Sequence, residues 1–165
     1  EQVVFQQAAG VSATNTITVN GNNNQLQFTG SSGAPYVLWL GGADRMFWHG
    51  LNVRAFGTYA FPLVFTGGAN YNMMSSCSFS CDPNGTAGTV QIPVVFSGSN
   101  QNYSTLGASG NYNTLKNCHL FSGYFTFSMY GGNVGNADRG GGAHRSSLSP
   151  ALACRCRSVR AVSHH

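Results

Sequence analysis

The sequence predicts an all-β fold, a right-handed parallel β-helix of about 4–5 turns. Three segments, residues 44–53, 70–79 and 111–120, align with one another at shifts of 26 and 41 residues. Apolar and polar side chains alternate within each segment, which is the periodicity of a strand. Asn and Gly are frequent between the segments and mark turns. A period in the twenties with two or three short strands is the length of one turn of such a helix, in which successive turns lie about 4.8 Å apart.

Further strands are expected around the aligned segments. The first turn is predicted from Val3-Val4-Phe5, residues 16–19 and residues 25–28. A second type of strand recurs once in each later turn, rich in β-branched and aromatic residues and followed by small ones. Its copies are residues 36–40, 61–66, 92–96 and 125–130.

The alternation also predicts which side chains face the core. In the third segment, Leu115 is predicted to point inward and Lys116 outward, and Asn117 occupies a bend. After the bend, Cys118 and Leu120 point inward and His119 outward. The predicted inward columns are Trp48, Met74 and Leu115; Leu51, Cys77 and Cys118; and Val53, Phe79 and Leu120. These columns are apolar in every copy, which supports the alignment.

The charge distribution divides the chain into two parts. Charged residues make up only 7% of the sequence, where about 25% is typical. Residues 1–138 hold three basic and four acidic residues, whereas residues 139–165 hold five Arg and no acid. We assign residues 1–138 to the β-helix, with an insertion near residues 81–107 that accounts for the longer second shift. Residues 139–165 form a basic, low-complexity tail.

The tail admits three interpretations. Its Arg residues could serve nucleic acid or an anionic surface electrostatically. Cys154 and Cys156 with His144, His164 and His165 could hold a metal, but one residue between paired Cys fits no usual zinc spacing. We favour a disordered or out-of-frame tail that packs poorly on the β-helix. No nucleic-acid partner, metal or cofactor is predicted, and no run of about 18 apolar residues predicts a membrane span.

Two ladders of like residues are expected between turns. Cys77 and Cys118 share an inward column, within disulfide range if their turns are adjacent. We favour two stacked thiols without a bond, and Cys81 is an alternative partner for either. Asp44 precedes a repeat in which the later copies have Asn70 and Asn111. We therefore favour a turn ladder over an acid catalyst for Asp44.

A family resemblance rests on four stretches: residues 1–4, residues 13–21, Leu38-Trp39-Leu40-Gly41-Gly42-Ala43-Asp44 and residues 111–118. They resemble the β-helix repeats of large secreted surface proteins of gliding-type bacteria, which share the pectate-lyase-like fold and use type IX secretion. The resemblance covers residues 1 to about 136 and implies a secreted or cell-surface location. It carries no catalytic motif. The chain is expected to be a fragment of a longer array.

The outward columns form the predicted functional face. One column contains His49, Ser75 and Lys116, and the next contains Asn52, Ser78 and His119. Asn52, Ser78, Lys116 and His119 are the candidate binding residues, and Lys116, His119 and His49 are the candidate catalytic residues. Lys with His could supply a base, but calcium-assisted lysis and glycoside hydrolysis need clustered carboxylates, which the sequence lacks. Trp39, Phe47 and Trp48 are expected in the core, although an exposed ring could stack on a sugar.

Two functions remain open. The favoured one is a non-catalytic structural or adhesive segment of a secreted surface protein that binds polysaccharide or a cell-surface glycan. The alternative is a fragment of a carbohydrate-active β-helix enzyme, a polysaccharide lyase or glycoside hydrolase. Such an enzyme should place two ionisable groups within about 6 Å on one face. End-to-end self-association through uncapped turns is also expected.

Overall fold

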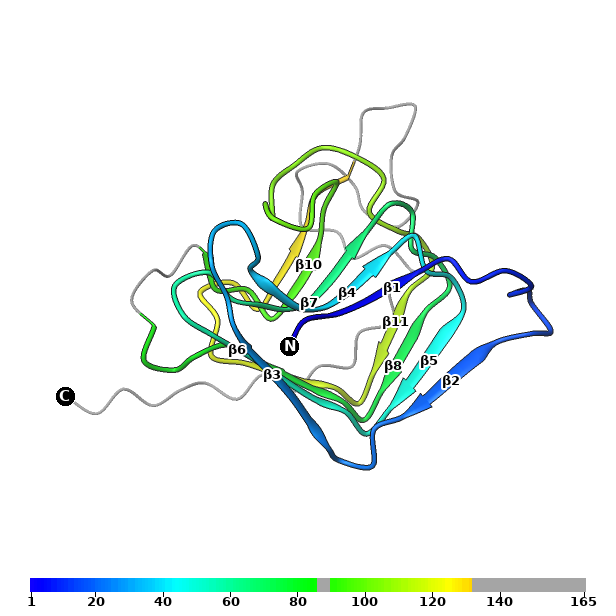
Figure 1. The fold of residues 1–165 in the computed structure, drawn as a ribbon, viewed down its shortest axis with the longest axis horizontal. Helices are drawn as coiled ribbons and strands as arrows, with labels where there is room; N and C mark the ends of the chain where they lie inside the picture. The colour runs from blue at the N-terminus through cyan, green and yellow to red at the C-terminus, as the bar shows by residue number, and fades with distance from the viewer. Residues whose placement is uncertain (86–89, 132–165) are drawn as a thin grey trace.

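The computed structural model describes residues 1–85 and 90–131, which form an all-β parallel β-solenoid of about four turns. Each complete turn contributes one strand to each of three parallel sheets, and Figure 1 shows these sheets surrounding a common core. The predicted fold class is therefore confirmed. The five Cys and His residues of the tail that were considered for a metal site, and the rest of residues 132–165, lie outside the described residues.

Sheet A has the order β1-β4-β7-β10-β13, with bounds Val3–Gln6, Tyr36–Gly41, Phe61–Thr66, Val94–Phe96 and Phe127–Met129. Sheet B contains β2 (Ile17–Asn20), β5 (Met46–His49), β8 (Met73–Ser75) and β11 (Thr114–Lys116). Sheet C contains β3 (Gln25–Thr29), β6 (Asn52–Phe56), β9 (Ser78–Ser80) and β12 (His119–Phe121). No helix within the described ranges is long and apolar enough to cross a membrane.

The register between turns is the one that the repeat predicts. Trp48 pairs with Met74 and Met74 with Leu115 in sheet B, and Val53 pairs with Phe79 in sheet C. All nine predicted inward side chains are at most 5% exposed. Strand alternation is the reason, because a side chain flanked by two outward neighbours must point into the coil.

Residues in the left-handed conformation make the bend between sheets B and C. Gly50, Ser76 and Asn117 occupy equivalent positions and have φ values of 61°, 54° and 53°. Gly and Asn adopt this conformation readily, whereas Ser pays a steric cost. The bend turns the chain from β5 into β6, from β8 into β9 and from β11 into β12 while the inward columns stay in register.

The outer face of sheet A is covered by a loop. Val64 and Val95, which point outward, are fully buried in a second apolar cluster with Phe61 and Ile92. Tyr103, from the long segment between β10 and β11, packs edge-on against Phe61 with 6.5 Å between ring centroids. Consequently, sheets B and C keep the accessible outer faces of the coil.

The expectation that three aromatic residues lie in the core is correct only for Trp48, which is 2% exposed. Trp39 belongs to the cluster outside sheet A, where its indole N–H donates to Thr66 Oγ1 at 2.8 Å. Phe47 pairs with Thr18 and Met73 in an outward column of sheet B and is half-buried. Each flanks an inward residue, so strand alternation turns it outward.

The predicted turn ladder is present. Asp44 Oδ1 accepts the backbone N–H of Asn70 at 2.6 Å, and Asn70 Oδ1 accepts that of Asn111 at 2.7 Å. The ladder ends at Asn111, whose buried Oδ1 has no hydrogen-bond partner in the described part of the chain. Asp44 is therefore part of the turn structure.

The thiols of the inward column are stacked without a bond. Cys77 and Cys118 are free and buried, and so is Cys81. Cys118 donates to the carbonyl of Met74 at 3.4 Å, and Cys81 donates to that of Ala60 at 3.3 Å. These contacts are those of packed core thiols.

Candidate functional site

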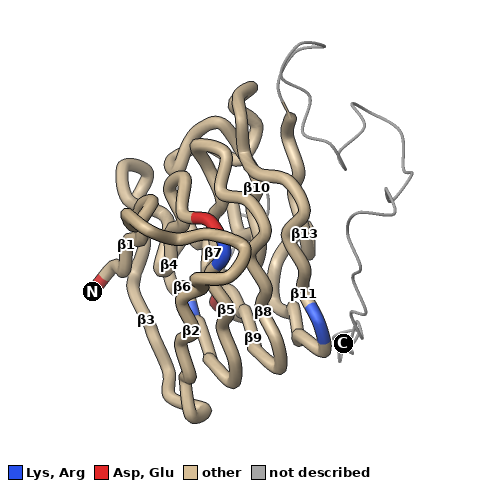
Figure 2. Tube along the Cα trace, turned by 90° about the vertical axis from the view of Figure 1, so that its right-hand side faces the viewer, with Lys and Arg blue, Asp and Glu red and all other residues tan. Residues whose placement is uncertain are grey.

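The described chain carries few charged residues, and most of its trace in Figure 2 is neither basic nor acidic. Three basic and three acidic residues occur within residues 1–85 and 90–131: Arg45, Arg54, Lys116, Glu1, Asp44 and Asp82. Any site on sheets B and C must therefore be built mainly from amides, hydroxyls and aromatic rings, with single charges placed among them.

The sheet B column holds two of the candidate catalytic residues. His49 pairs with Ser75, and Ser75 pairs with Lys116. His49 and Lys116 are both exposed. The strand of Ser75 lies between their strands, so their backbones are two strand spacings, about 9.6 Å, apart. No hydrogen bond joins their side chains within the described residues.

The sheet C column holds the candidate binding residues. Asn52 pairs with Ser78, and Ser78 pairs with His119. Ser78 Oγ donates to Asn52 Oδ1 at 2.6 Å, and Asn52 Nδ2 donates to the carbonyl of Asn23 at 2.7 Å. These bonds fix the two side chains in place. His119 is exposed and lies beyond the bend from Lys116, on a different sheet.

A second outward column on sheet C was missed from the sequence. Gln27 pairs with Arg54, Arg54 pairs with Ser80, and Ser80 pairs with Phe121. Each lies two residues after a member of the Asn52 column. Strand alternation thus supplied the signal, because side chains two positions apart share a face.

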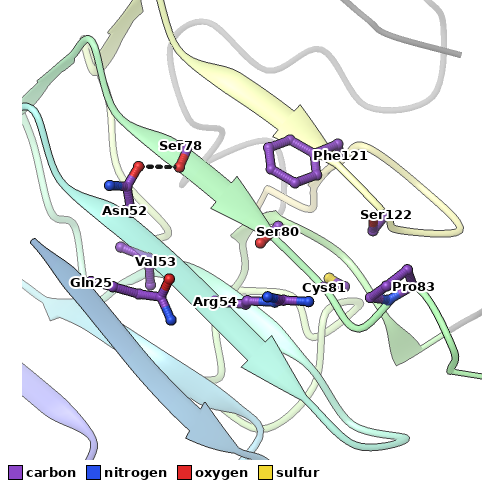
Figure 3. A pocket seen from close by; sticks show the side chains of 10 residues that line it. All are labelled: Gln25, Asn52, Val53, Arg54, Ser78, Ser80, Cys81, Pro83, Phe121 and Ser122. Atoms are coloured by element: carbon purple, nitrogen blue, oxygen red, sulfur yellow. Dashed lines mark hydrogen bonds between the residues drawn. The ribbon is translucent and has the colours of Figure 1, made fainter. Parts of the chain in front are cut away.

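The two columns border a hollow of about 250 Å³ on the outer face of sheet C, shown in Figure 3. Side chains from four turns and two loops surround it. Its lining residues are Gln25, Asn52, Val53, Arg54, Ser78, Ser80, Cys81, Pro83, Phe121 and Ser122. The structure thus brings Asn52 and Ser78 to the hollow, whereas Lys116, His119 and His49 do not line it.

Two polar side chains in the hollow, Ser80 and Arg54, have no hydrogen-bond partner among the described residues. Ser80 is only 5% exposed, and its hydroxyl forms no hydrogen bond within the described residues. The Arg54 guanidinium forms neither a hydrogen bond nor an ion pair there. Its central carbon lies 4.8 Å from the centroid of the Phe56 ring, a cation–π contact that orients the group. In Figure 3 the Arg54 side chain extends along its strand below Ser80 toward Pro83.

The chemical groups in the hollow suit binding. Within the described residues, no carboxylate lines it, and no three His, Cys, Asp or Glu side chains are grouped to hold a metal. Burial, helped by the charge of Asp82, raises the pKa of the Cys81 thiol, so this lining residue stays a neutral thiol. What remains is one guanidinium, several amide and hydroxyl groups, and the Phe121 ring, which is 42% exposed.

Fold and surface together define a class: a parallel β-solenoid with a polar hollow on an open outer sheet face. No protein-family model matches the sequence, and neither a curated protein nor a solved structure matches the chain. The class is therefore assigned from the chain's own strand pairing.

Proposed function

We propose that this chain is a non-catalytic structural or adhesive segment of a secreted β-helix surface protein and binds glycans on the outer faces of sheets B and C. The observation that carries the proposal is the hollow on sheet C. Amide and hydroxyl groups can exchange hydrogen bonds with sugar hydroxyls, and an exposed aromatic ring can pack against the C–H face of a sugar. Asn52, Ser78 and Phe121 supply these groups side by side.

The size of the hollow favours one unit of a longer ligand. Pockets that enclose a whole drug-sized molecule measure about 300–1,000 Å³. The present hollow, at about 250 Å³, is smaller and lies open on a sheet. The outward columns continue to either side of it, so neighbouring units of a polymer would meet similar polar side chains, including His119 and those of the Lys116 column.

The cellular setting is proposed on the sequence resemblance. The repeats resemble those of secreted surface proteins of gliding-type bacteria, and a surface dominated by Asn, Ser, Thr and Gly is compatible with that setting. End-to-end association of two copies belongs to the same proposal. It is supported by the buried Oδ1 of Asn111, which ends the turn ladder and has no donor within the described residues.

The experiment is affinity electrophoresis of the full chain in gels that contain a series of neutral and acidic polysaccharides. The chain is expected to be retarded by at least one polymer, and Phe121→Ala should weaken that retardation about three- to tenfold. Tyr124→Ala is the matched control, because Tyr124 is an exposed aromatic residue outside the hollow. Retardation by no polymer, or an equal effect of both variants, would contradict the proposed site. Release of oligosaccharides from the bound polymer would instead support the enzyme alternative.

A further inference from the structure

We infer that the hollow on sheet C is an anion subsite, in which Arg54 pairs with the carboxylate or sulfate group of an acidic polysaccharide. This inference rests on the proposed glycan binding and specifies its ligand class. It starts from Arg54, a residue that strand register alone places on this face between Gln27 and Ser80.

The guanidinium of Arg54 is held in place by a ring, but its charge is not paired within the described residues. The Phe56 ring covers it at 4.8 Å, and none of its five N–H donors has a protein acceptor within the described residues. Protein cations that lose part of their hydration are usually paired with an acid or an acceptor. No neighbour in the column supplies an acid, because Gln27, Ser80 and Phe121 are neutral, and Gln27 Oε1 already accepts a hydrogen bond from Gln25 Nε2 at 2.6 Å.

Asp82, the acidic residue next to the lining residues in the sequence, does not pair with Arg54. Asp82 lies between the lining residues Cys81 and Pro83, but it does not itself line the hollow. Its Oδ1 accepts the backbone N–H of Asn84 at 3.0 Å. The carboxylate is thus engaged in a turn, and the guanidinium remains open to an anion from outside.

Ser80 provides a second, independent indication of a ligand. Ser80 is 5% exposed and lines the hollow, and its hydroxyl has no hydrogen-bond partner within the described residues. The hydroxyl is therefore available to a ligand oxygen that enters the hollow. Arg54 and Ser80 pair across neighbouring strands, about 4.8 Å apart, so one anionic group can contact both.

The remaining lining favours a sugar acid over a small free anion. Phe121 follows Ser80 in the same column and leaves much of its ring exposed beside the hollow. A free phosphate or sulfate would leave this ring and the Asn52–Ser78 pair unused. A uronate or sulfated sugar would place its anion on Arg54, its hydroxyls on the amide and hydroxyl groups, and its C–H face on Phe121.

The test compares acidic polymers with an uncharged counterpart of the same backbone. The probes are alginate, its neutral propylene glycol ester, chondroitin sulfate and dextran, each titrated into the full chain. The chain is expected to bind alginate or chondroitin sulfate more tightly than the neutral polymers. Arg54→Gln should weaken binding to the acidic polymer about three- to tenfold, with a smaller loss for Arg54→Lys, which keeps the charge but not the two-pronged geometry. Ser80→Ala should weaken it as well.

The matched control is Arg45→Gln, because it removes the same charge from a position outside the hollow. The basic residues of the tail are present in every variant, so their attraction to acidic polymers cancels in the comparison. Equal affinities of Arg54→Gln and Arg45→Gln, or tighter binding of the neutral ester by the unchanged chain, would overturn the inference. If the chain binds dextran through Phe121 and Arg54→Gln has no effect, glycan binding stands and the anion subsite fails. If no polymer binds, both fail.

Discussion

Asn113 accepts two hydrogen bonds from Asn72 of the preceding turn. Its Oδ1 receives the backbone N–H of Asn72 at 2.9 Å and the side-chain Nδ2 at 3.0 Å. Asn72 Oδ1 in turn accepts the N–H of Met46 at 2.9 Å, and its Nδ2 also donates to the carbonyl of Ala43 at 2.8 Å. Both Asn side chains are buried, so this inner ladder satisfies backbone groups that water cannot reach.

The inner ladder requires an amide at position 72. Asn72→Asp keeps the shape but replaces the Nδ2 donor with an oxygen, which would face the carbonyl of Ala43 and Asn113 Oδ1. We expect the free energy of unfolding at pH 7 to fall by about 3 kcal/mol or more, because two buried acceptors lose their donor and a charge is buried. Urea denaturation measures the change.

Asn70→Asp is the matched control for this prediction. Asn70 belongs to the outer ladder, in which Asp44 already fills the same role with a carboxylate. We expect Asn70→Asp to cost clearly less than Asn72→Asp, since its Oδ1 still accepts the N–H of Asn111 and the only donor lost is the part-buried bond from Nδ2 to the Gly68 carbonyl. Equal losses in the two variants would show that the inner ladder has no special need for an amide.

The bend at Ser76 should respond to backbone conformation alone. Ser76 is exposed and has a φ of 54°, which β-branched residues avoid. Ser76→Gly is expected to raise the free energy of unfolding by a few tenths to about 1 kcal/mol, and Ser76→Val to lower it by at least about 1 kcal/mol. Chemical denaturation of the two variants side by side provides the measurement. A Val variant as stable as the Gly variant would refute the bend's conformational requirement.

The buried Cys81 thiol should make stability fall in alkaline solution. Burial raises the pKa of Cys81. The hydrogen bond between Cys77 and Cys118 lowers the pKa of Cys77 to about 7 and raises that of Cys118, so the contributions of these two thiols oppose each other. In the unfolded chain a Cys thiol ionises at about pH 8.5. Above that pH the unfolded state has lost the Cys81 proton that the folded state keeps, so this thiol lowers the free energy of unfolding as pH rises.

The expected decrease between pH 7.5 and 9.5 from the Cys81 thiol is about 1.4 kcal/mol. Urea denaturation in the presence of a phosphine reductant checks it. Cys81→Ala should remove this contribution from the pH dependence, whatever its effect on stability at pH 7.5. An unchanged pH dependence in Cys81→Ala would mean that its thiol titrates normally in the folded chain.

Much of the fold could be predicted because strand alternation and the turn period act on neighbouring residues. The inward position of Met74, for example, follows from its polar or outward neighbours and from the matching position of Leu115. The Asp44 ladder was also predictable, since Asp and Asn at equivalent turn positions make the same backbone bonds. The inner ladder was not, because the sequence Asn70-Tyr71-Asn72 does not show which Asn faces inward. The φ of 57° at Tyr71 separates the two.

The candidate site was predictable only in part for a similar reason. Asn52 and Ser78 were assigned to the outer face by register, and both line the hollow. Arg54, Ser80 and Phe121 obey the same alternation, but their shared hollow also depends on Pro83 and Ser122, which belong to loops. Loop positions have no period, so no alignment of repeats could place them.

By itself, the sequence determined the coil, its inward columns and the bends between sheets B and C, because these follow from local alternation and repeat at a fixed spacing. Only the tertiary structure decided which outer faces stay accessible. Tyr103, far along the chain from β7, covers sheet A at Phe61, whereas sheet C keeps an open hollow around Arg54. Which outer face is covered depends on contacts between residues distant in sequence, and these contacts depend on how the turns and loops pack in space.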